Sequence, residues 1–257
     1  MSTSSRSRSE VSSRPAGAAP LGRSSPVEAS ADRQLSRWGG VAALAGVGLM
    51  LGAFVVVGVL GLPDASDVET LTDFADIEAG RIAEHFLYLG ALMLLALHVL
   101  VLHRLLKEAD PAASLFGAAV AEVGFVVMAA SSMLHVSTSP LADLYTAPDA
   151  SSADREAIEY AWHGAQSVFD TMLTTGVLLV PIGIVLLGIA MRSAAEFGPR
   201  LGLAALTLGA VGVVGAVTAI VDPGSAFTAA SVLAIVVFHA ITGWRTLRLG
   251  KGSPPGR

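Results

Sequence analysis

The chain has 257 residues, of which 53% are hydrophobic and only 14% charged, and its mean hydropathy is +0.65. Soluble domains carry about 25% charged residues, so this composition excludes an ordinary soluble domain. The sequence contains no cysteine, which excludes disulfides, thiolate metal sites and cysteine nucleophiles.

The N-terminal segment, residues 1–36, is rich in Ser, Arg, Ala and Pro. It has too little apolar surface to offset the entropy lost on ordering, so we expect a disordered tail. The apolar run at 41–62 is too long for the hydrophobic region of a signal peptide and predicts a first membrane span. Its Gly48 and Gly52 form a G-x-x-x-G pair, which lets a helix approach closely, either in a dimer or inside the bundle.

Five further apolar stretches are each long enough to cross a bilayer, which takes about 20 residues. They predict spans at about 82–106, 112–136, 165–191, 201–221 and 225–246. The link between the second and third spans is short, so these two are expected to be antiparallel, and Pro111 suits the first turn of the third. Pro181 is expected to kink the fourth span. Glycines of the fifth, such as Gly209, Gly212 and Gly215, are expected to be packing positions.

Two acidic segments, 63–80 and 137–162, separate these spans on one side. In the first, Val68, Leu71, Phe74 and Ile77 recur at helical spacing and predict a short amphipathic helix on the membrane surface. In the second, Ser152 is expected to cap a short helix, and Trp162 to lie in the interfacial aromatic belt.

The distribution of basic residues sets the predicted orientation. With six spans both termini share one side, and that side then carries 14 of the 16 Lys and Arg residues, leaving Arg81 and Arg155 opposite. The positive-inside rule therefore places both termini in the cytoplasm.

The expected fold is thus an all-α polytopic membrane protein with a six-helix domain at 37–249, between a tail at 1–36 and another at 250–257. The predicted location is the plasma membrane of a prokaryote, with membrane lipids as partners. Nothing in the sequence supports nucleic-acid binding, and the oligomeric state is not specified.

Three ionisable residues lie deep within the predicted spans: Glu122, His98 and His239. Charged groups near the bilayer centre are costly and tend to face the bundle interior. Similar depths suggest that the three meet in an intramembrane polar site. This would relay protons, bind an ion or line a cavity, or would be a structural hydrogen bond that pins the helices together. Facing histidines would alternatively ligate a haem iron.

A second group of ionisable residues lies near the outer helix ends. His85, His135, His163 and Asp170 are candidate ligands for a divalent metal such as zinc, which favours three or four nitrogen and oxygen ligands. The alternative is that these histidines are solvated or hydrogen-bonded, as is common at helix ends.

The segment GIAMRSAAEFGPRLGLAALTLGAVG, with Arg192-Ser193 and Pro199-Arg200-Leu201-Gly202, resembles a bacterial family of six-span membrane proteins catalogued only as a domain of unknown function. The similarity extends to Arg81 before the second span and to HRLLKEADP after it, and covers roughly residues 38–250. The resemblance implies the fold but brings no established activity, so no catalytic residue is carried over.

A second resemblance is to the intramembrane metal hydrolases that include the alkaline ceramidases. There an S-x-x-x-H pattern, an aspartate and later histidines build a zinc site, and Ser131, His135 and Asp170 are similar to parts of it. The terminal H-x-x-x-H of that family is missing, because the last span carries only His239.

The function we expect is that of a non-enzymatic membrane protein which binds or passes a small molecule, ion or lipid within its helix bundle. The alternatives are a metal-dependent membrane hydrolase that uses the outer histidines and a haem-binding electron carrier. No cofactor is predicted for the expected non-enzymatic function. Zinc would belong to the hydrolase alternative and haem to the electron-carrier alternative.

Overall fold

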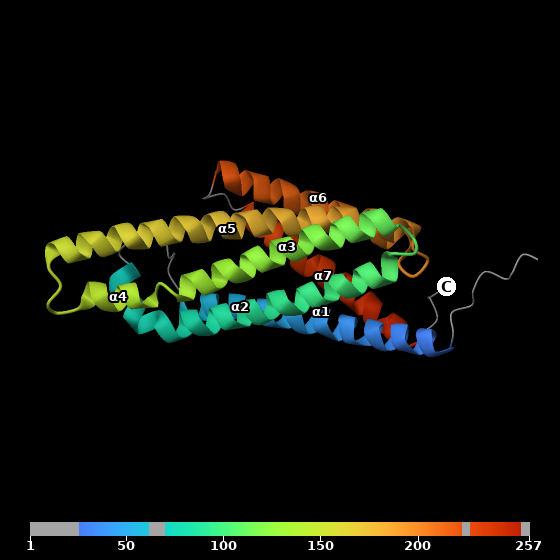
Figure 1. Cartoon of the computed structure of the whole chain (residues 1–257), viewed down its shortest axis with the longest axis horizontal. Helices are drawn as coiled ribbons and strands as arrows, with labels where there is room; N and C mark the ends of the chain where they lie inside the picture. The colour runs from blue at the N-terminus through green and yellow to red at the C-terminus, as the bar shows by residue number, and fades with distance from the viewer. Residues whose placement is uncertain (1–25, 62–69, 223–226, 253–257) are drawn as a thin grey trace, which may run out of the picture.

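The computed structural model describes residues 26–61, 70–222 and 227–252 as an all-α bundle (Figure 1). Six of its helices are long and apolar enough to cross a membrane, which confirms the predicted fold class. They are α1 Pro26–Leu60, α2 Thr70–Leu106, α3 Pro111–Val136, α5 Ser152–Ser193, α6 Gly198–Val221 and α7 Thr228–Gly250. A short helix, α4 Ser139–Thr146, lies between α3 and α5.

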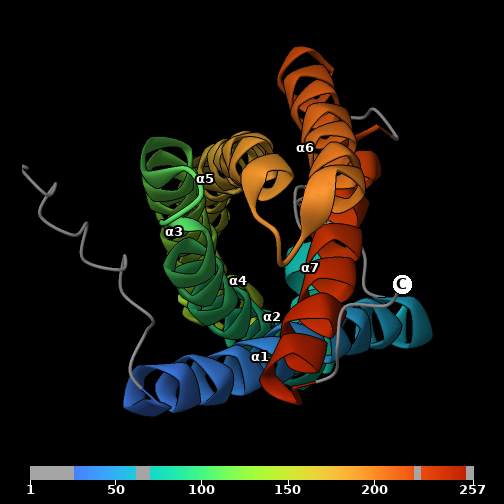
Figure 2. The same cartoon turned by 90° about the vertical axis from the view of Figure 1, so that its right-hand side faces the viewer.

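The long helices form a ring in chain order, because each packs against the next and α7 packs back against α1. Figure 2 looks along the bundle, with α3 and α5 on one side and α6 and α7 on the other. The start of α1 and the end of α7 lie at the same end (Figure 1), where a Cβ added to Gly250 would touch the backbone of Arg37.

Helices α3 and α5 approach each other through two pairs of glycines. A Cβ added at Gly183 would lie 2.6 Å from the carbonyl oxygen of Gly117, and one added at Gly176 would lie 2.7 Å from the carbonyl oxygen of Gly124. Within each helix the two glycines are two turns apart and so lie on one face. Small residues let helix backbones approach closely where lipid gives no hydrophobic drive for association.

Glycines also set the contact between α5 and α6, as predicted. Gly212 lies against the ring of Pro181, and a Cβ added at Gly209 would lie 2.9 Å from the Pro181 carbonyl oxygen. By contrast, a Cβ at Gly48 would meet no atom within 4 Å among the described residues, whereas one at Gly52 would just reach a Leu87 methyl at 4.0 Å. Gly48 is therefore not a packing position inside this bundle.

The connection between α2 and α3 has the predicted form. Pro111 lies in the first turn of α3, and the Asp110 carboxylate caps the helix by accepting a hydrogen bond of 3.0 Å from the Ala113 amide. The cap satisfies one of the amides that the first turn leaves without a helical partner.

The predicted disordered tail was too long at its C-terminal end. Helix α1 begins at Pro26, so residues 26–36 are helical, whereas residues 1–25 lie outside the described part of the chain. Tertiary contacts explain the difference, because Asp32 pairs with Arg104 of α2 at 3.2 Å and the backbone at Arg37 packs on α7. The C-terminal tail beyond residue 252 is also outside the described residues.

The part of the molecule that contains the two acidic segments differs from expectation as well. From Thr70 on, the first acidic segment is the start of α2 rather than a separate surface helix, and residues 62–69 lie outside the described chain. Leu71 is fully buried with Ala142 of α4 and Trp162 of α5. Trp162 therefore fills a small core at this end of the molecule and is not a residue of an aromatic belt.

The helix expected to be short and capped by Ser152 is in fact the start of α5. Its cap is Ser151, which forms a capping box with Asp154. Hydrogen bonds from the hydroxyl and the amide of Ser151 hold the pKa of Asp154 below its usual value. This local signal starts a helix that then runs unbroken, through Pro181, to Ser193.

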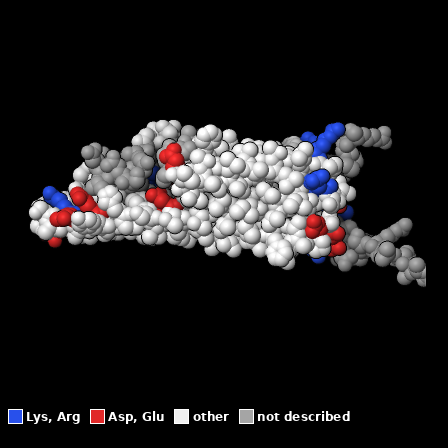
Figure 3. Space-filling view, turned by 90° about the horizontal axis from the view of Figure 1, so that it is seen from above, with Lys and Arg blue, Asp and Glu red and all other residues white. Residues whose placement is uncertain are grey.

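Charge is distributed unevenly along the bundle. On the face that Figure 3 shows, the middle of the bundle is uncharged, and the charged side chains lie toward the two ends. Among the described residues, every Lys and Arg except Arg81 and Arg155 belongs to the end where α1 begins and α7 ends, which we call the basic end. The opposite end, with α4 and the start of α5, is called the acidic end.

Candidate functional site

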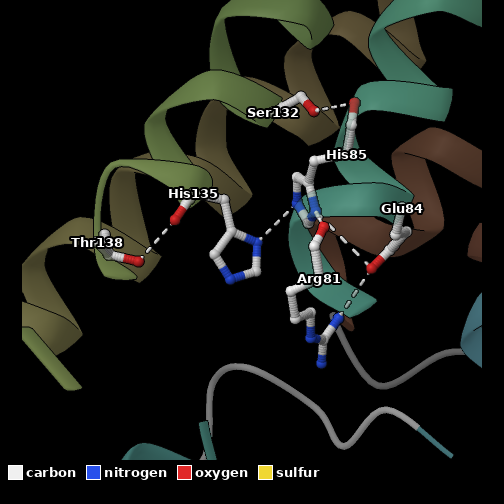
Figure 4. A network of polar contacts seen from close by, with 6 residues as sticks. All are labelled: Arg81, Glu84, His85, Ser132, His135 and Thr138. Atoms are coloured by element: carbon white, nitrogen blue, oxygen red, sulfur yellow. Dashed lines mark hydrogen bonds and ion pairs between the residues drawn. The ribbon is translucent and has the colours of Figure 1, made fainter. Parts of the chain in front are cut away.

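Two buried histidines meet near the acidic end of the bundle, as Figure 4 shows. His85 of α2 and His135 of α3 are 5% and 4% exposed, and Nε2 of His85 lies 3.0 Å from Nδ1 of His135. The rings meet edge to face with centroids 4.6 Å apart. Phe169 also packs against His135, with ring centroids 4.7 Å apart, and places α5 beside the pair.

The backbone of α2 fixes the direction of this hydrogen bond. Nδ1 of His85 lies 2.8 Å from the carbonyl oxygen of Arg81, and a carbonyl oxygen only accepts, so His85 carries its proton on Nδ1. Its neutral ring therefore accepts at Nε2, and Nδ1–H of His135 is the donor. The chain runs from His135 through His85 to Arg81 and leaves a lone pair on Nε2 of His135.

That lone pair has no hydrogen-bond partner among the described residues, although the atom is buried. His135 lines a cavity of about 10 Å³ together with Arg81 and Ser139. A cavity needs about 10–15 Å³ to hold one water molecule, so the space beside the pair matches a single water.

Other polar groups hold the two histidines in place. Arg81 pairs with Glu84 at 3.3 Å, and the Glu84 carboxylate lies 3.7 Å from Nδ1 of His85. On α3, the hydroxyl of Ser132 donates to the His85 carbonyl at 3.4 Å, which ties α3 to α2 directly. The pair is thus part of a network rather than two isolated side chains.

The network borders a pocket of about 250 Å³ to which all six long helices contribute. Its polar lining residues, which we call the polar wall, are Glu84, His85, Tyr88, Ser131, Ser132 and Thr174. The rest is apolar and is made of Phe54, Phe169, Leu173, Val177, Ala219 and Val232. Sequence reasoning missed Tyr88, although it lies one turn from Glu84 and His85 on the same face of α2.

The structure does not assemble the predicted outer metal site. His85 and His135 meet, but His163 and Asp170 are exposed on α5 and join neither of them. Among residues 26–61, 70–222 and 227–252, no group of three His, Asp or Glu side chains is arranged to hold a metal ion. Burial of Trp162 fixes the rotation of α5 and turns the adjacent His163 outward.

The expected S-x-x-x-H partnership is also not made. The Ser131 hydroxyl donates to the Met128 carbonyl of its own helix at 2.8 Å, and His135 is bonded to His85 instead. Both side chains remain buried; Ser131 belongs to the polar wall of the pocket, whereas His135 packs against Phe169.

Deeper in the bundle, the structure brings His98 of α2 and His239 of α7 together. Both are fully buried, and their Nδ1 atoms lie 3.0 Å apart. Two like nitrogens form a hydrogen bond only when one carries the proton and the other does not, so the two neutral rings must be different tautomers. The rings of Phe125 and Phe238 surround His239, with centroids 5.7 Å and 5.1 Å away.

Glu122 is not joined to this pair by any hydrogen bond or ion pair that the structure gives. Its side chain is partly buried, and its Oε1 atom has no hydrogen-bond partner among the described residues. Glu122 lies one turn before Phe125 on α3, and it is Phe125, not Glu122, whose ring contacts His239. The predicted three-residue cluster is therefore a histidine pair with a separate carboxyl group.

The contact between the two deep rings also leaves no space between them for a haem iron. Each metal–nitrogen bond takes about 2 Å, as it does for zinc, so an iron between the rings would hold the two nitrogens about 4 Å apart. The two Nδ1 atoms lie only 3.0 Å apart, at hydrogen-bonding distance. The pair instead links α2 to α7, just as the outer pair links α2 to α3.

Comparison of the chain with protein-family models, with curated proteins and with solved structures found no match in any of the three. The geometry described above is accordingly the basis for the functional argument.

Proposed function

We propose that this is an integral protein of the prokaryotic plasma membrane, with both termini in the cytoplasm, that binds a small amphiphilic molecule inside its bundle. The concentration of Lys and Arg at the basic end supports the orientation, because cytoplasmic segments of membrane proteins are enriched in these residues. Alkaline phosphatase, which works only outside the cytoplasm, would contradict this orientation if it were active when fused at Arg257.

The observation that carries the binding role is the 250 Å³ pocket beside the outer histidine pair. Ligand sites are typically apolar cavities with a few placed polar groups that fix orientation, and this pocket has that division. Glu84, Tyr88 and Thr174 offer hydrogen bonds to a polar head, whereas Phe169 and Leu173 offer apolar surface to the body of the ligand.

The histidine chain adds a chemical property to the polar wall. His85 lines the pocket and is the acceptor for His135, so a proton reaching Nε2 of His135 is passed on as His135 releases its Nδ1 proton to His85. The resulting imidazolium lies 3.7 Å from the Glu84 carboxylate, which stabilises it. The head that fits this wall is therefore one that exchanges hydrogen bonds or a proton with an imidazole.

Binding is tested with 4-bromophenol as the probe, because it has a hydroxyl head, an aromatic body and a bromine that quenches tryptophan. The variant Trp38→Phe/Trp244→Phe leaves Trp162 as the fluorophore, and its ring centroid lies 6.5 Å from that of His135. In lipid nanodiscs we expect saturable quenching of Trp162.

The matched control uses two alanines of α6. Ala219 lines the pocket and Ala210 is exposed outside it, so Ala219→Phe is expected to abolish the saturable component and Ala210→Phe to keep it. Quenching that rises linearly with the probe and is equal in both variants would reflect partition into lipid and would refute the proposal.

A further inference from the structure

A second ligand site is suggested at the basic end, on the outer surface of α1 and far from the histidine pocket. It begins with two arginines one turn apart, Arg33 and Arg37. Both are exposed, and neither has a hydrogen bond or ion pair to any described residue. The nearby Asp32 carboxylate is already paired with Arg104 at 3.2 Å.

These arginines line a cavity of about 470 Å³ together with Gln34, Trp38 and Gly250. Two arginines and a glutamine thus line this cavity, and no carboxylate is among its lining residues. Guanidinium groups bind phosphate oxygens through parallel hydrogen bonds, so the cavity has the chemistry of a phosphate site.

An apolar groove of about 440 Å³ lies beside this cavity, between α1 and α2. Trp38 and Val41 line both spaces and separate one from the other. Ala42 and Ala45 of α1 leave room in the groove, and Leu97 and Leu100 of α2, which are 53% and 50% exposed, face it.

The length of the groove matches one leaflet of a bilayer. It extends from Leu35 to Ala45 along α1, which is about 15 Å at 1.5 Å per residue. The hydrocarbon core of a bilayer is about 30 Å thick, so the groove spans about half of it. Trp38, which is 66% exposed, lies at the junction, where tryptophan side chains prefer the interface between headgroups and hydrocarbon.

We propose that this surface binds an anionic phospholipid of the leaflet at the basic end, with its phosphate on Arg33 and Arg37 and an acyl chain in the groove between α1 and α2. Charge complementarity selects this occupant, because two guanidinium groups that have no partner among the described residues and lie beside an apolar groove favour a negative headgroup over a zwitterionic one. The site is independent of the histidine pocket and does not depend on the ligand proposed there.

The test uses Trp38 itself as the reporter. In the Trp244→Phe variant, Trp38 is the exposed tryptophan, and the fully buried Trp162 contributes a constant background. The protein is placed in nanodiscs of dioleoylphosphatidylcholine that contain increasing amounts of brominated phosphatidylglycerol or brominated phosphatidylcholine. We expect half-maximal quenching of Trp38 at a mole fraction about tenfold lower for the glycerol lipid, since each basic residue near the surface attracts anionic lipid appreciably.

Two pairs of variants separate this site from the general charge of the basic end. Arg33→Gln/Arg37→Gln is expected to remove the preference, whereas Arg192→Gln/Arg200→Gln, which removes two exposed arginines elsewhere at the same end, is expected to keep it. Likewise, Ala45→Phe fills the groove and is expected to weaken quenching, whereas Ala210→Phe on the exposed face of α6 leaves it unchanged.

Equal quenching by the two lipids in the protein with native arginines would overturn the proposal. So would an equal loss of preference in the two arginine double variants, because the effect would then belong to the whole basic end. Trp38 that resists quenching by either lipid would mean that another part of the chain or a second copy covers the groove, and this too would refute lipid binding.

Discussion

The replacement Gly183→Ala tests the contact between α3 and α5 most directly. The added Cβ would lie 2.6 Å from the Gly117 carbonyl oxygen and 2.8 Å from the Ala121 amide nitrogen. Ordinary contacts of a Cβ begin at 3.4 Å, so the two backbones must separate by roughly 0.8 Å. Because the blocking atoms are mainly backbone, no rotamer change relieves the clash.

The expected cost follows from two opposing terms. Inserting a methyl group into a packed interior costs about 1–3 kcal/mol, and replacing glycine by alanine within a helix returns up to about 1 kcal/mol. Because backbone atoms block the added methyl group, the cost lies in the upper half of its range, and we expect Gly183→Ala to lower the free energy of unfolding by about 1–2 kcal/mol. The reciprocal change Gly117→Ala meets the same partner backbone, so the double variant should lose less than the sum of the single losses.

The measurement is unfolding by SDS in mixed micelles in the Trp38→Phe/Trp244→Phe background, followed by the fluorescence of Trp162 on α5. Gly164→Ala is the control on the same helix, because its Cβ would meet no described atom within 4 Å and it should be neutral or stabilising. If Gly183→Ala withstands as much SDS as the parent protein, or as much as Gly164→Ala does, then α3 and α5 do not make the contact described here.

Three further predictions concern individual polar groups. His98→Ala leaves Nδ1 of His239 buried without a partner, so it should lower the free energy of unfolding by about 1–3 kcal/mol in the same SDS assay, and an unchanged value would refute the pairing. Asp110→Ala removes the cap on the Ala113 amide and should cost about 0.5–2 kcal/mol, whereas Asp110→Asn or Asp110→Ser should restore most of it. For His135, the ¹⁵N chemical shifts of the imidazole near neutral pH should report a protonated Nδ1 and an unprotonated Nε2; the opposite tautomer would contradict the direction of the histidine chain.

The number of membrane-spanning helices and the α2–α3 hairpin were predictable, because the length of an apolar run and the shortness of a link decide them. The residues at which α1 and α5 begin were not predictable from the sequence, since both helices start in polar sequence ahead of their apolar runs. The Asp32–Arg104 ion pair and the contact of Arg37 with α7 hold the start of α1 in place. The local sequence of α1 does not predict either contact.

The candidate sites show the same division. Helical rise was enough to place His98 and His239 at similar depth, and the structure brings them together. To predict whether His163 and Asp170 meet the other outer histidines, the rotation of α5 about its axis had to be known. That rotation is set by Trp162, which packs against Leu71 of α2. That partner lies far away in the sequence, so the outward direction of His163 could not be inferred from α5 alone.

The packing of α7 against α1 has a consequence for how the protein is made. During synthesis α1 enters the membrane first and α7 last, yet Gly40 lies against the backbone of Leu247 and Ala43 against Gly243. The bundle therefore remains an open arc, with this face of α1 in lipid, until the final span leaves the ribosome. A chain that ends early, through a stop codon or proteolysis, loses closure of the whole arc and not merely one helix.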